Sequence, residues 1–71
     1  MQATWEITIE RRDGSQLFCR QFHGREPSPQ EVVEATDDIG RTVRARIGVV
    51  TKHPPKAAGL GIFQISAREI D

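Results

Sequence analysis

The chain has 71 residues, and its ten Lys and Arg side chains balance ten Asp and Glu side chains, so its formal net charge at pH 7 is zero. A chain of this length forms one small domain, residues 1–71, with little room for a deep catalytic cleft. The lone Cys19 argues against a disulfide scaffold, and the sequence shows no spacing of zinc ligands and no apolar run long enough to span a membrane. We therefore expect a cytoplasmic domain without metal or cofactor.

The first organised segment is residues 4–11, in which apolar and polar side chains alternate strictly. A period of two in β-branched and aromatic residues predicts a half-buried strand. Its inward row would hold Trp5, Ile7 and Ile9. The polar residues between them would then face outward.

A second strand is predicted over residues 16–22, because the Asp-Gly pair before it tolerates the positive φ angles of a tight hairpin turn. The facing of this strand stays open. Leu17 and Cys19 lie on one side of it, and Phe18 and Phe22 lie on the other.

The next segment carries the signals of a helix start. Ser28 stands at the N-cap, Pro29 at the first helical position, and Glu31 completes a capping box. We expect the helix to span residues 29–39 and to end at Gly40, which suits the left-handed residue that follows a helix. The side chains at three-to-four spacing that would pack on the sheet are Val32, Val33, Ala35, Thr36 and Ile39.

Two more strands are predicted in the C-terminal part of the chain. Residues 41–53 alternate, with an inward row of Val43, Ala45, Ile47 and Val49 and an outward row of Arg44, Arg46, Gly48, Val50 and Lys52. A ten-residue connection, residues 52–61, leads to a last alternating segment. The inward row of that segment would hold Phe63, Ile65 and Ala67.

The predicted order is therefore ββαββ. Two antiparallel hairpins and one helix most economically form an α+β two-layer sandwich, in which a single four-stranded antiparallel sheet carries the helix on one face. The sequence does not determine which strand edges meet.

Such a fold leaves one sheet face uncovered, and that face is the candidate binding surface. Strand periodicity places several arginines on it, and two phenylalanines join them if they share the side of Arg20. The connection over residues 52–61 is a second candidate surface, because long loops in small domains are often functional. The candidate binding residues are Phe18, Arg20, Phe22, Arg44, Arg46, Lys52, His53, Lys56 and Arg68.

Charge is unevenly distributed along the chain. Residues 1–40 hold four basic and eight acidic side chains, a net charge of −4, whereas residues 41–71 hold six basic and two acidic side chains, a net charge of +4. Such an asymmetry can steer a charged partner or orient self-association.

Three interpretations of the uncovered face stay open. Glu6 and Glu10 could pair with arginines across the strands, a common arrangement worth only a few tenths of a kcal/mol per pair. Aromatic and arginine side chains could instead bind single-stranded RNA, although a sequence pI of about 6.7 and the two carboxylates argue against this. Exposed apolar side chains could also bind another protein or a second copy of the chain.

We expect a non-enzymatic binding or adaptor module, with a protein partner or a homodimer favoured and single-stranded nucleic acid as the alternative. Catalysis is disfavoured, because Cys19 is predicted on a strand and His53 in a connection, with no sequence signal that pairs them. Asp37 and Asp38 with Glu34 would make at best a weak cation cluster. We therefore assign no catalytic or metal-binding residue and no membrane association.

Overall fold

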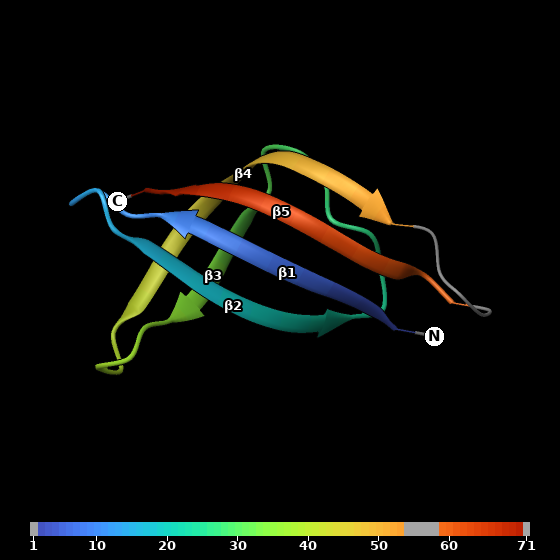
Figure 1. Cartoon of the computed structure of the whole chain (residues 1–71), viewed down its shortest axis with the longest axis horizontal. Coiled ribbons are helices and arrows are strands. Elements are labelled where there is room, and N and C mark those ends of the chain that lie inside the picture. Colours follow the sequence, from blue (N-terminus) through green and yellow to red (C-terminus); the bar gives the residue numbers. More distant parts are fainter. Residues whose placement is uncertain (1, 54–58, 71) are drawn as a thin grey trace.

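The computed structural model describes residues 2–53 and 59–70 of the chain (Figure 1). Within these residues the fold consists of five strands and contains no helix. The strands are β1 (Ala3–Glu10), β2 (Gln16–His23), β3 (Val32–Thr36), β4 (Thr42–His53) and β5 (Gly61–Glu69).

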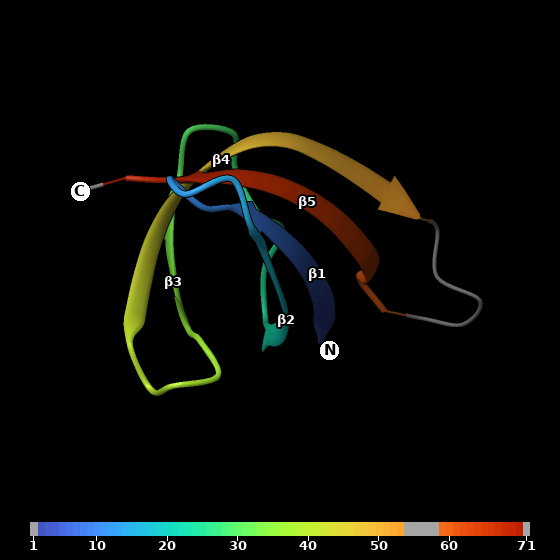
Figure 2. The ribbon, with the colours of Figure 1, turned by 60° about the vertical axis from the view of Figure 1, so that its left-hand side comes forward.

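All five strands belong to one mixed sheet in the order β2-β1-β5-β4-β3. Neighbouring strands are antiparallel, except that β1 and β5 are parallel. The sheet curls into a nearly closed barrel that brings its edge strands, β2 and β3, toward each other (Figure 2). The Gln21 Nε2 atom donates a hydrogen bond of 2.7 Å to the Glu34 carbonyl across this seam.

The prediction of an α+β sandwich with one helix and a four-stranded antiparallel sheet is therefore wrong. The hairpin of β1 and β2 is confirmed. However, the C-terminal strand β5 inserts beside the N-terminal strand β1 in parallel orientation, and a fifth strand replaces the helix. The parallel pairing joins the two ends of the chain, so no local turn signal announces it.

The residues predicted to start the helix form a tight turn instead. The Glu31 amide donates to the Ser28 backbone carbonyl at 3.2 Å, and the Glu31 carboxylate accepts from the Ser28 amide at 3.1 Å. The second of these is one of the two contacts of a capping box, and it exists here within a single turn. Gln30 has a φ of 72°, which stops a right-handed helix from continuing. Proline followed by a residue with positive φ is the pattern of a type II turn. The chain then enters β3, where Val33 and Ala35 are buried and Glu34 is exposed.

The inward rows predicted from the alternation, apart from Val49, form the core of the barrel. Trp5, Ile7, Ile9, Ile47 and Phe63 are its largest side chains, and each is less than 2% exposed. The other buried apolar residues are Ala3, Val33, Ala35, Val43, Ala45, Ile65 and Ala67, with Leu17, Cys19, Val50 and Leu60 packed against them. The facing of β2 is thereby settled, with Leu17 and Cys19 directed inward.

A bulge at Gly48 reverses the predicted facing of the last part of β4. The register with β5 shifts between Ile47 and Val49, and one extra residue moves every later side chain to the opposite face. Val49 was predicted inward but is 62% exposed. Val50 was predicted outward but packs against the core.

Polar contacts close one end of the barrel around Trp5. The indole Nε1 donates to the Arg25 carbonyl at 3.1 Å, and the ring stacks on His23 with centroids 3.7 Å apart. The Arg25 guanidinium lies 5.0 Å from the centre of the Trp5 ring and donates to the Glu31 carboxylate. The latter bond keeps the pKa of Glu31 below its ordinary value. These contacts attach the connection between β2 and β3 to the core.

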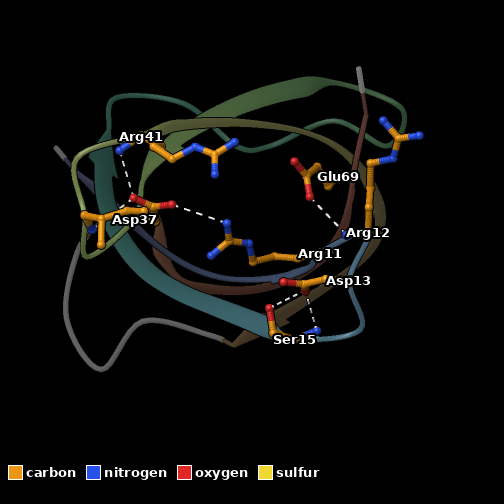
Figure 3. Close-up of polar contacts among 8 residues, drawn as sticks. Arg11, Arg12, Asp13, Ser15, Asp37, Arg41 and Glu69 are labelled. Atoms are coloured by element: carbon orange, nitrogen blue, oxygen red, sulfur yellow. Dashed lines mark hydrogen bonds and ion pairs between the residues drawn. The ribbon is translucent and has the colours of Figure 1, made fainter.

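The other end is closed by Asp37, which follows β3 (Figure 3). Its buried carboxylate accepts hydrogen bonds from the amides of Ile39 at 3.1 Å and Arg41 at 2.8 Å. The Arg11 guanidinium, which follows β1, donates to the same carboxylate at 3.3 Å. This ion pair joins the turn between β3 and β4 to the hairpin of β1 and β2. It also excludes Asp37 from the weak cation cluster considered above, because its oxygens are already occupied.

Candidate functional site

Four cross-strand rows of outward-facing side chains run over β2, β1, β5 and β4, and we call this surface the outer face. The first row holds Phe18, Thr8, Ser66 and Val49, and the second holds Arg20, Glu6, Gln64 and Thr51. The third holds Phe22, Thr4, Ile62 and His53, and the fourth holds Gln16, Glu10, Arg68 and Arg46. The outer face corresponds to the uncovered face predicted from the sequence, although it is the outside of a barrel rather than one side of a sandwich.

Large apolar side chains are exposed on this face. Phe18 is 69% exposed, Phe22 59%, Val49 62% and Ile62 42%. The first row places Phe18 and Val49 on either side of the short side chains Thr8 and Ser66. An open groove of about 670 Å³ runs between this row and the polar second row, and residues of both rows line it. An arrangement of apolar walls and a low polar floor can accept apolar side chains of another chain.

The charges next to this groove largely compensate each other. Arg20, which lies between the two phenylalanines on β2, donates to the Glu6 carboxylate at 3.0 Å. The Arg68 Nε atom lies 3.9 Å from a Glu10 carboxylate oxygen. The interpretation of cross-strand ion pairs therefore accounts for part of the surface, but it does not account for the exposed aromatics.

The fourth row has an excess of positive charge. Arg46 of β4 stands directly opposite Arg68 of β5. Arg46 donates to the Gln30 carbonyl at 3.0 Å, and no carboxylate within the described residues forms an ion pair with it. A second depression of about 580 Å³ is lined by both arginines and by the carboxylates Glu10 and Glu69, and it also borders Gly48, Val49 and Ser66. It therefore shares a border with the first groove.

The structure brings only some of the predicted site residues together. The predicted residues that lie on the outer face are Phe18, Arg20, Phe22, Arg46, His53 and Arg68. Arg44 also faces outward, but it lies nearer the start of β4, opposite Glu34 of β3. Lys52 leaves the face because of the bulge, and its Nζ atom contacts Glu26 at 2.9 Å and lies 5.9 Å from the Phe63 ring. Lys56, with residues 54–58 of the predicted basic connection, lies outside the described residues.

The sequence reasoning missed two groups of residues. Val49 and Thr51 join the outer face only because of the bulge, and Gly48 in the middle of an alternating strand was the signal for it. Asp37 was considered only as part of a weak cation cluster with Asp38 and Glu34, but it is a buried ion-pair partner. Its spacing to Gly40 was the signal of a turn closed by an aspartate side chain.

The described residues do not activate Cys19 as a nucleophile. Partial burial raises the pKa of its thiol, and its Sγ atom accepts a hydrogen bond from Gln21 Nε2 at 4.0 Å. A raised thiol pKa leaves the unreactive protonated form in place at neutral pH. Within the same residues, no group of three His, Cys, Asp or Glu side chains is placed to hold a metal ion. No helix long and apolar enough to cross a membrane occurs in the described part of the chain.

Comparison with known proteins gives no relative for this arrangement. No family model, no curated protein and no solved structure matches the chain.

Proposed function

We propose that this chain is a cytoplasmic, non-enzymatic binding module that docks another protein molecule on its outer face. The observation that carries the proposal is that four large apolar side chains, Phe18, Phe22, Val49 and Ile62, are exposed on one face of a 71-residue domain. Exposed aromatic residues around a groove are typical of protein interfaces. The cytoplasmic location is supported by the lone, unpaired Cys19.

The electrostatics of this face favour a protein over single-stranded nucleic acid. A nucleic-acid site needs net positive charge to neutralise phosphates. Here the arginine beside the two phenylalanines is paired with Glu6, and Glu10 lies on the same surface. The whole chain has no net charge. Exposed apolar side chains interspersed with charges of both signs match the composition of protein interfaces instead.

The proposal is tested by replacing both phenylalanines of β2. Immobilised wild-type chain is used to capture proteins from a lysate, and each captured protein, together with a second copy of the chain, is then purified and titrated by calorimetry. We expect the double variant Phe18→Ser/Phe22→Ser to bind at least about tenfold more weakly than the wild type, since aromatic anchors dominate interface energies. Both side chains are exposed, so the variant keeps its fold.

Gln16→Ser is the matched control, because Gln16 lies on the same strand and the same face but carries no apolar surface. It should bind like the wild type. Equal affinity of the double variant and the wild type for the purified partner would contradict the proposal. So would binding of a twelve-nucleotide oligouridine that is lost in the double variant while no protein binds.

A further inference from the structure

The second half of β4, residues 48–53, has one side that pairs with no other strand, and we call this side the open edge. β5 pairs with the opposite side of these residues, whereas the pairing of β4 with β3 ends at Arg46. In both views this half of β4 lies at the margin of the molecule, and no strand of the described residues lies beyond it (Figures 1 and 2). An unpaired edge of this kind is a template for a strand of another chain.

The pairing with β5 determines which backbone groups point to the open edge. The Ile70 amide donates to the Arg44 carbonyl at 2.8 Å, so the even-numbered residues of β5 are those that bond to β4. After the bulge, their partners on β4 are Val49, Thr51 and His53. The amides and carbonyls of Val50 and Lys52, at the alternate positions, therefore point to the open edge. Beyond Ile47, no backbone hydrogen bond within the described residues joins β4 to the connection that precedes β3.

The side chains of the open edge also favour a further strand. Residues 49–51 are consecutive β-branched residues, which have a high propensity for strands. Val50 is directed inward but is only half-buried, whereas Ile65, opposite it on β5, is buried. Lysine is a residue with which proteins protect open edges. Here, however, the charge of Lys52 is paired with the Glu26 carboxylate at 2.9 Å, so it offers little repulsion to another chain.

The open edge is complementary to itself. Antiparallel pairing with the same strand of a second copy, centred on Thr51, places Val50 opposite Lys52 of the second copy, and each such pair exchanges both backbone hydrogen bonds. Pairing centred on Val50 would instead leave Lys52 opposite the bulge at Gly48. Pairing centred on Lys52 would place two ammonium groups directly opposite each other, which is unfavourable. The register centred on Thr51 therefore satisfies the most backbone groups without a repulsive pair.

We propose that two copies of the chain pair through their open edges about a two-fold axis at Thr51, so that their sheets join into one continuous sheet. The Thr51 side chains of the two copies then lie side by side, and paired threonines are among the favourable cross-strand contacts. The zero net charge of the chain means that the copies do not repel each other as a whole. The outer faces of both copies lie on the same side of the joined sheet. This inference goes beyond the proposed function, because binding on the outer face does not require the dimer.

Because both copies use the same surface, the contact is isologous and association stops at the dimer. A short strand pair buries less than the roughly 800 Å² per partner of a stable interface. Association is therefore weak, and it is measured at concentrations from about 10 μM to about 1 mM.

Sedimentation and amide hydrogen exchange test the wild-type chain over this range. We expect a monomer at about 10 μM and a dimer, with nothing larger, at about 1 mM. The amides of Val50 and Lys52 should exchange rapidly in the monomer and slowly in the dimer, because the second copy supplies their acceptors. The Thr51 amide, which bonds to β5, should be protected at both concentrations.

A pair of charged variants tests the register. Thr51→Lys and Thr51→Glu each place like charges directly opposite across the two-fold axis, so each variant alone should dimerise at least about tenfold more weakly than the wild type. An equimolar mixture should dimerise again, because the lysine of one variant faces the glutamate of the other. Thr51 is exposed, so both variants keep the fold.

A proline variant tests the backbone contacts. Lys52→Pro removes a donor from the open edge without removing a bond to β5, and it should remain a monomer at about 1 mM. The matched control Lys52→Thr removes the same charge but keeps the amide, so it should dimerise like the wild type. Melting curves establish that both variants are folded. The monomeric Lys52→Pro chain should still bind the purified partner of the outer face with wild-type affinity.

Three results would overturn this inference. They are a wild-type monomer at about 1 mM, a mixture of the two charged variants that stays monomeric, or a folded Lys52→Pro chain that dimerises like Lys52→Thr. None of these results removes the proposed function, which depends on the loss of partner binding in the Phe18→Ser/Phe22→Ser variant. A dimer that is lost in that variant but kept in Lys52→Pro would place the second copy on the outer face instead of the open edge.

Discussion

Replacing Ile47 with Asp should leave the chain unfolded at about 25 °C and pH 7. Ile47 is 1% exposed in the middle of β4, and its backbone amide and carbonyl bond to Glu31 and Gln30 at 2.8 and 2.9 Å. Loss of a buried aliphatic side chain costs about 2–5 kcal/mol, and an unpaired buried carboxylate costs several kcal/mol more. The free energy of unfolding of a 71-residue domain is only about 4–10 kcal/mol, so the variant should lose its fold.

Far-ultraviolet circular dichroism and the dispersion of amide resonances measure this outcome. The control is Arg46→Ala, one residue earlier, where the side chain faces outward and donates one hydrogen bond to the Gln30 carbonyl. That variant should unfold cooperatively, with a loss of about 1 kcal/mol or less. A folded Ile47→Asp chain, or an unfolded Arg46→Ala chain, would show that the inward and outward rows of β4 are assigned wrongly.

Ile47 and Arg46 show what the alternation of apolar and polar residues can predict from the sequence. Every inward residue predicted in β1, in the first part of β4 and in β5 is buried, because a period of two has only two possible facings and the apolar row selects one. The prediction failed after Gly48, where one unpaired residue exchanges the two rows. Val49 and Thr51 therefore became part of the candidate site, and Lys52 left it. A bulge adds only one residue to a strand, so the periodicity of the sequence alone does not reveal it.

The missing helix shows a different limit. Pro29 suits both the first position of a helix and a type II turn, and the Glu31 carboxylate accepts from the Ser28 amide in both, so the local signal did not distinguish the two structures. The choice between helix and turn is decided by the strand with which the following segment pairs. β3 pairs with the first part of β4, and Val33 and Ala35 complete the barrel interior, which requires strand geometry. Long-range pairing of this kind, like that of β1 with β5, overrides local propensity.

The second large effect is expected at Asp37. Asp37→Asn should lower the melting temperature at pH 7 by about 5–10 °C, because the Arg11 guanidinium would lose its ionised partner at the closed end of the barrel. The Arg11 Nε atom is already buried without a hydrogen-bond partner among the described residues, so loss of the Asp37 carboxylate would leave this guanidinium still less compensated. Asp38→Asn, at the exposed neighbouring position, is the control and should melt like the wild type.

The stabilisation of the fold by the Asp37 carboxylate should be lost as the pH falls. The Arg41 amide, followed by the Ile39 amide and the Arg11 guanidinium, holds the pKa of Asp37 below its ordinary value, and these contacts outweigh the opposite effect of burial. A carboxyl group with a depressed pKa in the folded state stabilises the fold above its unfolded pKa of about 4, and this stabilisation is lost as pH falls through the folded value. The difference in melting temperature between wild type and Asp37→Asn should therefore be constant from pH 7 to about pH 5 and should shrink below about pH 4. Protonation then gives the wild-type carboxyl group the same neutral character as the amide.

A difference that stays the same at pH 3 and pH 7 would show that Asp37 stabilises the turn through its shape and hydrogen bonds alone, and that its negative charge contributes nothing to the closure of the barrel by Arg11.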